Sequence, residues 1–140
     1  MSASSDKQTP DSGGYVVDTT PIPLLQKIKT DGRVWSDLAA QYGVANPEPP
    51  WKITLEATCD LLAADSCVKH VDEIIPGSCV LPALERRAEE DELSATIYDD
   101  VPFPERQLLA LAHSLIKRGL VNESELAARM EEVGQRLNSV

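Results

Sequence analysis

Apolar residues recur at the spacing of an α-helix most clearly between residues 104 and 119. They fall on one helical face: Leu108, Leu109, Leu111, Ala112, Leu115 and Ile116. Pro104 suits the first turn, where its missing N–H costs no hydrogen bond. Lys117 and Arg118 lie in the last turn, where cations interact favourably with the helix dipole. Gly119 is placed to end the helix, so we predict that the strongest helix of the chain runs from 104 to 118.

A last helix is predicted from Glu123 to about Leu137. Asn122, followed three residues later by Glu125, resembles a capping box. Apolar residues then recur at helical spacing at Leu126, Met130 and Val133. Because only a few residues connect this helix to the preceding one, the two are expected to form an antiparallel hairpin.

Two more helices are predicted in the middle of the chain, at residues 51–64 and 81–93. The first has a broad apolar face: Ile53, Leu55, Ala57, Leu61 and Leu62. The second is mostly charged and leaves a narrow apolar stripe: Leu81, Leu84, Ala88 and Leu93. No segment alternates apolar and polar residues as a strand would. We therefore predict an all-α fold, an irregular helical domain of four to six helices that ends in the antiparallel hairpin.

The N-terminal part of the chain, 1–50, has a different pattern. Residues 1–20 are rich in Ser, Asp, Gly and Thr, which predicts a mobile arm. Short helices are expected at residues 21–29 and 35–42, with Ser36 as N-cap and Gly43 as the end of the second one. The chain therefore divides into an extended N-terminal arm with short helices, residues 1–50, and a helical domain, residues 51–140. Because the arm is short and polar, we expect it to wrap a neighbouring chain.

The charge of the chain excludes two classes of partner. It has 13 Lys and Arg against 23 Asp and Glu, a formal net charge of -10. Nucleic acids and anionic membranes require clustered cations, so neither is an expected partner. No apolar run approaches the roughly 20 residues that span a bilayer, and the polar N-terminus does not resemble a secretory signal. A cytoplasmic location is expected.

The candidate metal ligands are few and badly spaced. Cys59, Cys67 and Cys79 form no CxxC pair, and only His70 and His113 could add nitrogen ligands. A metal site within the chain is therefore not expected. We interpret the cysteines as reduced and mostly buried thiols.

Nor does the sequence contain a recognisable catalytic constellation. It has no glycine-rich phosphate loop and no GxSxG motif. The acidic run from Glu89 to Glu92 could bind a divalent cation or serve acid–base chemistry. Four consecutive acids are more typical of a solvated helix face. His113 lies among the apolar residues of the strongest helix and is interpreted as a half-buried, hydrogen-bonded histidine rather than a catalytic base.

Three arginines are better candidates for a binding role. Arg86 and Arg87 are adjacent, so on a helix they diverge by about 100°, and one can follow the packed stripe while the other faces solvent. Arg106 lies in the first turn of the strongest helix, where a cation is unfavourable. It is expected either to pair with a nearby carboxylate or to reach an anion on a partner chain. The nearby carboxylates are Asp99, Asp100 and Glu105.

Three segments stand out together: WKITLEATCDLL (51–62), LPALERRAEE (81–90) and VPFPERQLLALAHSLIKRGLVNESEL (101–126). In order and spacing they resemble the helical N-terminal half of nitrile hydratase beta subunits and the small beta subunit of thiocyanate hydrolase. The resemblance covers roughly residues 50–137. It implies a noncatalytic beta-type subunit of an enzyme that adds water across the C≡N bond of a nitrile or of thiocyanate.

In these enzymes the metal, cobalt or iron, is held by a different chain with a CxxCxC motif of oxidised cysteines. The resemblance therefore implies that this chain binds no cofactor and completes the active site of a metal-binding alpha-type catalytic subunit. The arginine that hydrogen-bonds the oxidised sulfurs corresponds to Arg86, with Arg87 as the alternative. Such a contact orients and tunes metal ligands.

The resemblance also implies further roles. Phe103 and Gln107 are expected to border the substrate pocket, and Arg106 and Trp51 to lie at the subunit interface. The family has two consecutive aromatics before the helix and another after the arginine, whereas this chain has Phe103, Pro104 and Gln107 there. The pocket wall is therefore expected to differ and to suit another substrate.

The resemblance also implies partner chains, because this sequence lacks a part that the two-subunit enzymes have. An SH3-like barrel follows the helical half in two-subunit nitrile hydratases, and a third chain is expected to supply it here, as in the three-subunit enzymes. Two alternatives stay open. One is a nitrile hydratase activator, a metal-delivering chaperone that shares the helical region. The other is an acidic helical adaptor with no enzymatic link.

Overall fold

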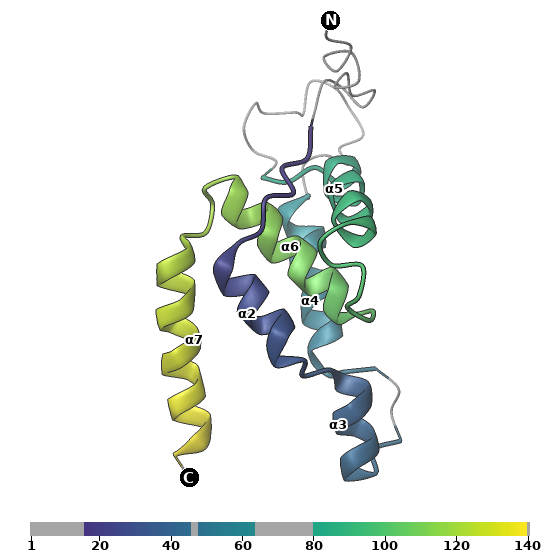
Figure 1. The fold of residues 1–140 in the computed structure, drawn as a ribbon, viewed down its shortest axis with the longest axis vertical. Helices are drawn as coiled ribbons and strands as arrows, with labels where there is room; N and C mark the ends of the chain where they lie inside the picture. The colour runs from purple at the N-terminus through teal and green to yellow at the C-terminus, as the bar shows by residue number, and fades with distance from the viewer. Residues whose placement is uncertain (1–15, 46–47, 64–79, 140) are drawn as a thin grey trace, which may run out of the picture.

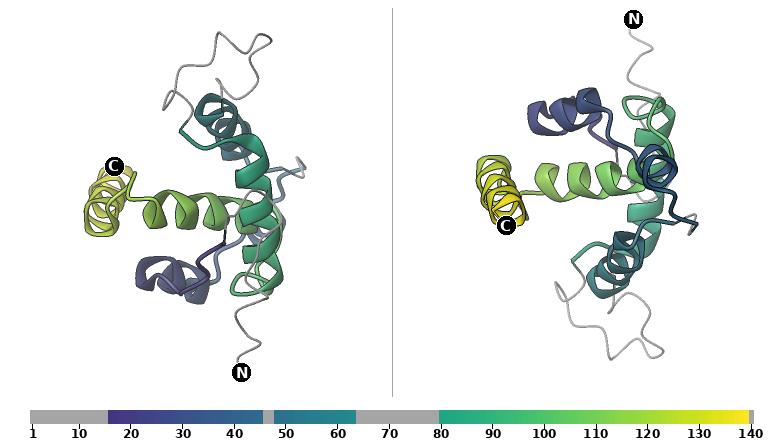
Figure 2. Two further views of the ribbon diagram at one scale, coloured as in Figure 1. Left: turned by 90° about the horizontal axis from the view of Figure 1, so that it is seen from above. Right: turned by 90° about the horizontal axis from the view of Figure 1, so that it is seen from below.

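The computed structural model describes residues 16–45, 48–63 and 80–139. Within these ranges all regular structure is helical, which confirms the all-α prediction. The helices are α2 (Pro23–Asp31), α3 (Trp35–Tyr42), α4 (Trp51–Leu62), α5 (Ala83–Ala95), α6 (Glu105–Lys117) and α7 (Glu123–Asn138). Helix α6 occupies the centre (Figure 1). Figure 2 shows α2 and α4 on opposite sides of α6, while α5 crosses one end of it.

Most of the predicted helix ends are confirmed by backbone geometry. Asn122 is the N-cap of α7, and its side chain accepts a hydrogen bond of 3.0 Å from the Glu125 N–H. Gly43 and Gly119 follow α3 and α6 with φ of 67° and 75°, a left-handed conformation that glycine adopts without steric cost. The prediction for Ser36 is wrong, because Ser36 lies inside α3: the helix begins at Trp35, and Val34 takes the cap position.

The largest core lies between α2 and α6 and the turn that follows α5. Its buried members come from all three parts of the chain: Ile22, Leu25, Leu93, Tyr98, Val101, Leu109 and Ala110. Leu25, Leu93 and Tyr98 are fully enclosed. The core therefore joins residues that are far apart in the sequence, and it holds the N-terminal helix α2 against the central helix.

A second, smaller core lies between α4, α6 and the segment before α5. It consists of Leu55, Cys59, Leu81 and Leu111. Helix α6 contributes to both cores: Leu109 and Ala110 belong to the main core, and Leu111 belongs to the smaller one. This double role explains why its apolar face is wide, as the sequence predicted. The predicted stripe of α5 needs one correction, because Leu84 is 85% exposed.

The N-terminal segment lies differently from the prediction. The sequence placed residues 1–50 in an arm outside the core, but Ile22 and Leu25 are buried in the main core of this same chain. The reason is that α6 provides an apolar surface against which the apolar residues of this segment pack. The short helices predicted within this segment are present as α2 and α3.

Carboxylates from the C-terminal half of the chain hold the N-terminal helices in place. Neither α2 nor α3 has a capping side chain at its own N-cap. The Glu123 carboxylate accepts a 3.0 Å hydrogen bond from the Leu24 N–H at the start of α2. The Glu105 carboxylate accepts one from the Trp35 N–H at the start of α3. These acids satisfy backbone donors that a helix leaves unpaired at its first turn.

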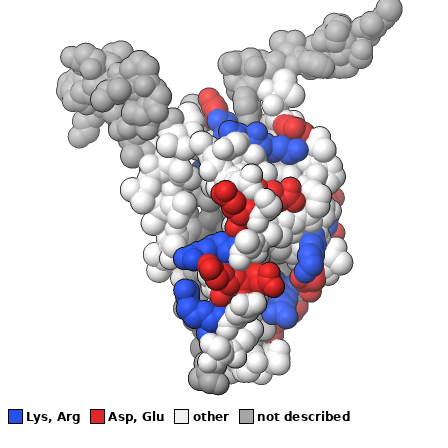
Figure 3. Space-filling view, turned by 90° about the vertical axis from the view of Figure 1, so that its left-hand side faces the viewer, with Lys and Arg blue, Asp and Glu red and all other residues white. Residues whose placement is uncertain are grey.

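Helix α7 is set apart from the rest of the described structure. A short connection joins it to α6, as predicted, but the two helices diverge and have few contacts along their lengths (Figures 1 and 2). None of its described residues is buried. Close packing along the C-terminal hairpin is therefore not present, and the apolar side of α7 is largely open. On the face where α7 lies, basic and acidic patches are interspersed (Figure 3).

Candidate docking surface

A hollow of the described surface lies where α2, α3, α4 and α6 meet. It has a volume of about 520 Å³ and is lined mainly by apolar side chains, with Trp35, Trp51, Val101, Leu108 and Leu109 among them. A second hollow of about 290 Å³ lies between α4 and α6, and Trp51 and Leu108 line this one as well. The two hollows share these two residues, and we call them together the Trp51–Leu108 groove.

Local sequence explains why the groove is open. Trp51 is the first residue of α4, directly after a pair of prolines, and its indole is only partly buried. Leu108 lies in the first turns of α6 and is exposed. Exposed apolar side chains that gather at a groove are typical of a surface that binds another molecule.

Three of the four charged residues that line the groove are held by neighbours of the same chain. Lys29 donates a 2.7 Å hydrogen bond to the Ile97 carbonyl and forms a 3.2 Å ion pair with Asp100. Glu105 is engaged with the backbone of α3. These contacts leave the floor of the groove apolar and its edge polar. Protein–protein interfaces have the same arrangement.

The two arginines of α5 lie in different environments. Arg86 is partly buried and forms an ion pair of 2.8 Å with Glu90. Arg87 is more exposed, with its Nε 4.0 Å from a carboxylate oxygen of Asp91. Burial raises the pKa of the Cys59 thiol, and the nearby Arg86 partly opposes that rise. The divergence expected for adjacent helical residues is therefore present, and Arg86 is the member that follows the packed side.

The residues predicted for the substrate pocket lie at the start of α6. Phe103 is exposed, and the ammonium of Lys52 lies 5.7 Å from its ring centre. The side-chain oxygen of Gln107 is buried and has no hydrogen-bond partner among the described residues. In the described part of the chain Arg106 forms no ion pair. The pairing expected for Arg106 is therefore absent: Asp100 binds Lys29 instead, and Glu105 caps α3.

The structure separates these predicted residues into two places. Trp51 lies at the beginning of α4, close to Leu108. Arg86 lies next to Cys59, which follows Trp51 two turns later on the same helix. At a rise of 1.5 Å per residue, about 12 Å of helix lies between the two places. A ligand that contacts both must therefore span about 12 Å.

Sequence reasoning missed a buried carboxylate. The pattern assigned Glu89 to a solvated acidic face, but it is 2% exposed and contacts the Arg118 guanidinium. Arg118 also forms an ion pair of 2.8 Å with Glu85. The signal was present in the spacing, because Glu89 precedes the buried Leu93 by four residues and so shares its helix face. The neighbouring acids Asp91 and Glu92 are exposed, as predicted.

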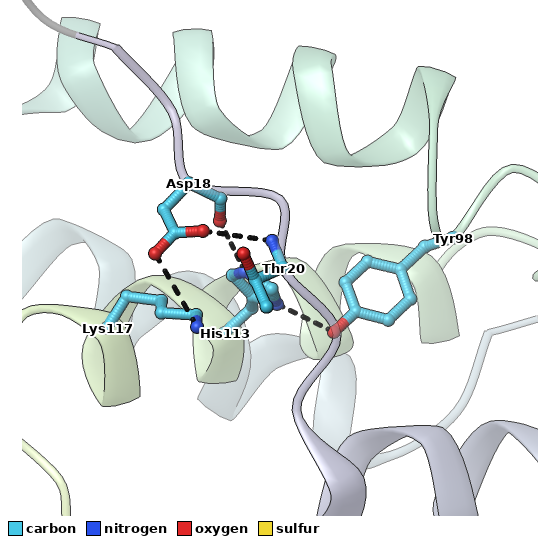
Figure 4. Close-up of polar contacts among 5 residues, drawn as sticks. All are labelled: Asp18, Thr20, Tyr98, His113 and Lys117. Carbon is cyan, nitrogen blue, oxygen red and sulfur yellow. Dashed lines mark hydrogen bonds and ion pairs between the residues drawn. The ribbon is translucent and has the colours of Figure 1, made fainter.

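The buried histidine has the character that the sequence predicted, but its burial is complete. His113 is 1% exposed. Its Nδ1 lies 2.9 Å from the Tyr98 hydroxyl and its Nε2 lies 2.8 Å from the Asp18 carbonyl oxygen (Figure 4). Both ring nitrogens therefore have partners within the chain, which supports a structural role.

A metal site and a membrane-spanning helix are both absent from the described residues. No group of three or more His, Cys, Asp or Glu side chains there could hold a metal ion. Cys67, Cys79 and His70 lie outside the described ranges. Within the same ranges, no helix has both the length and the apolar character needed to cross a membrane.

Comparison with protein-family models, with curated proteins and with solved structures finds no match to this chain. The resemblance to the beta subunits therefore rests on the three segments 51–62, 81–90 and 101–126.

Proposed function

We propose that this chain is a noncatalytic beta-type subunit of a metal-dependent nitrile hydratase or thiocyanate hydrolase, and that it completes the active site of a metal-bearing partner chain. Two observations support the proposal. One is the order and spacing of the three resembling segments. The other, which carries the structural argument, is the Trp51–Leu108 groove, an apolar surface that this chain leaves uncovered.

In this proposal the groove receives the alpha-type catalytic subunit. Cobalt or iron and the oxidised cysteines lie on that partner, and an SH3-like barrel comes from a third chain. Phe103, just before α6, and Gln107, in its first turn, border the substrate. A partner that covers Trp51 and Leu108 removes exposed apolar area from water, at about 25 cal/mol per Å².

The arginines of α5 then contact the partner at the far end of α4. Glu90 fixes the guanidinium of Arg86 within the chain, and the guanidinium has further N–H groups that can donate. Arg87 is exposed and reaches outward. We assign the contact with the oxidised sulfurs to Arg86 and keep Arg87 as the alternative. The separation of Trp51 and Cys59 along α4 agrees with a partner that covers most of the length of this helix.

Co-expression with the genomic neighbours of this chain, followed by purification and metal analysis, tests the proposal. A stoichiometric complex that contains cobalt or iron and a CxxCxC chain is the expected result. Leu108→Glu should prevent its assembly, whereas Leu137→Glu, on the exposed side of α7, should not. Purification of this chain alone as a soluble monomer would contradict the subunit role and favour the activator or the adaptor.

Activity of the complex toward nitriles and thiocyanate tests the arginine assignment. Arg86→Lys keeps the charge but loses the planar donor pair, so activity should fall at least tenfold while the complex stays intact. Arg87→Lys is the matched control. If Arg87→Lys is the inactive variant, the roles of the two arginines are exchanged. If neither substitution changes activity, α5 does not reach the oxidised cysteines.

A further inference from the structure

Helix α7 carries a narrow apolar stripe that the described part of the chain leaves largely uncovered. Its members are spaced by four, three and four residues: Leu126, Met130, Val133 and Leu137. None of them is buried, and Met130 and Leu137 are 42% and 68% exposed. Spacing that alternates between three and four residues gives a stripe of the width that one other helix covers, as in a coiled coil. We call these four residues the α7 seam.

A row of charged residues runs along one flank of the seam, and its charges alternate. Glu125, Arg129, Glu132 and Arg136 each stand one position before a seam residue. At 100° per residue they therefore lie on the same side of it. All four are exposed, and Arg129 forms an ion pair of 2.7 Å with Glu132 of its own helix. Figure 3 shows basic and acidic patches interspersed on the face where α7 lies.

The other flank of the seam is formed by small residues. Ala127 and Gly134 each follow a seam residue by one position. Small side chains at a helix contact allow the two backbones to come close. The place that a Cβ of Gly134 would occupy is open, and Ala127 lines a hollow of about 490 Å³ together with Leu24 and Lys27 of α2. A second helix therefore has room on this flank as well.

We propose that α7 is a contact surface between two copies of this chain, in which the two α7 helices pack antiparallel about a two-fold axis. The two seams then interlock, with Met130 against Val133 of the other copy and Leu126 against Leu137 of the other copy. A two-fold contact requires a self-complementary surface. The α7 seam meets this requirement, because its spacing of four, three and four residues is the same in both directions.

The charged row selects the antiparallel direction. In sequence order its charges are acid, base, acid, base, and reversal of the helix gives base, acid, base, acid. Glu125 then faces Arg136 of the other copy, and Arg129 faces Glu132 of the other copy. In a parallel pair the charged flank of one helix would face the small flank of the other, and these ion pairs could not form. Complementary charges across a contact favour one orientation.

The size of the contact predicts a reversible dimer. Helix α7 has 16 residues and offers four layers of seam residues. Interfaces below about 1,200 Å² are typical of weak and transient complexes. Because α7 is already folded and capped in the single chain, association does not have to order it. No α7 residue lines the Trp51–Leu108 groove, so one chain can use both surfaces at once.

Sedimentation equilibrium of the full chain over a range of concentrations tests the proposal. A monomer–dimer equilibrium is expected. Val133→Glu places a charge in the seam and should weaken association at least tenfold. Gln135→Glu adds the same charge on the opposite, exposed side of α7 and should leave the dimer unchanged. Because α7 buries none of its residues, both variants should keep the folded core, which circular dichroism verifies.

Charge reversal tests the direction of the two helices. Arg129→Glu and Glu132→Arg each bring like charges together at two places in the antiparallel dimer, so each should weaken association at least threefold. The chain with both substitutions keeps the original net charge and restores opposite charges at both places. Its association should therefore return to that of the unmodified chain.

Four outcomes would overturn the proposal. The chain could stay monomeric at every concentration. Gln135→Glu could weaken the dimer as much as Val133→Glu, which would place the contact outside the seam. The doubly substituted chain could fail to regain association, which would exclude the antiparallel charge pairs. Leu108→Glu, in the groove, could abolish the dimer. All these measurements use this chain alone, so they do not depend on whether it binds a metal-bearing chain.

Discussion

Helices α6 and α7 have similar amphipathic patterns, but only α6 is buried. Helix α6 buries Leu109, Ala110, Leu111, His113 and Ser114, and both cores form around it. Helix α7 is longer than α6, begins with a well-formed cap and buries none of its residues. The difference shows that an apolar stripe predicts a helix and a face that needs covering. It does not indicate whether the residues that bury this face belong to the same chain.

The polar contacts of the two helices differ in the same way. Arg118, at the end of α6, reaches the buried Glu89 and joins α6 to α5. Arg129, on α7, pairs with Glu132 on its own helix, and both side chains are exposed. Removing one partner of a buried ion pair leaves an uncompensated charge, whereas exposed pairs contribute little. Substitutions on the two helices should therefore differ strongly in their effect on stability.

The largest difference is expected for matched leucines. Leu109→Ala should lower the free energy of unfolding by about 3 kcal/mol, because it leaves a cavity in the main core. Leu137→Ala should lower it by less than about 0.5 kcal/mol, because that side chain is exposed. Urea unfolding followed by circular dichroism measures both. Equal losses would show that α7 packs as firmly as α6.

The arginines of the two helices give the next largest difference. Arg118→Met removes the guanidinium that contacts buried Glu89, and it should cost about 2–3 kcal/mol. Arg129→Met should cost less than about 0.5 kcal/mol, because it breaks an exposed pair. Thermal unfolding at pH 7 compares them. A negligible effect of Arg118→Met would mean that buried Glu89 does not depend on Arg118 for its stabilisation.

A smaller effect is expected at the hydrogen bond that joins α7 to α2. Glu123→Ala removes the carboxylate that accepts from the Leu24 N–H, and it should cost about 1 kcal/mol. Glu125→Ala, in the same turn, is exposed and serves as the control for the helix dipole. Urea unfolding of both variants isolates the contact with α2. If both variants lose the same free energy of unfolding, the loss comes from the helix dipole and not from the contact with α2.

The smallest effect is expected for truncation after Leu126. This change keeps Asn122 and Glu123 but removes most of α7, and the free energy of unfolding of the remainder should change by less than about 0.5 kcal/mol. Ultracentrifugation of the truncated chain reports its association state at the same time. A loss as large as that of Leu109→Ala would contradict the separation of α7 from both cores.

The candidate site could be predicted only in part. Trp51 and Phe103 were predicted only through the resemblance of the segments 51–62 and 101–126 to the beta subunits. The sequence could not predict that Leu108 would lie beside Trp51, because Leu108 belongs to the same apolar face as the buried Leu109. Nor could it place Arg86 near Cys59, since that requires the packing of α5 on α4.

The sequence by itself determined the helical character of the chain and most helix ends. Spacing of apolar residues, the Asn122 cap and the glycines after α3 and α6 act within a few residues, so they can be read locally. Only the tertiary structure decided that Ile22 and Leu25 enter the core, that Glu89 is buried with Arg118, and that α7 stays uncovered. Burial depends on which surfaces meet, and surfaces far apart in the sequence meet only in the folded chain.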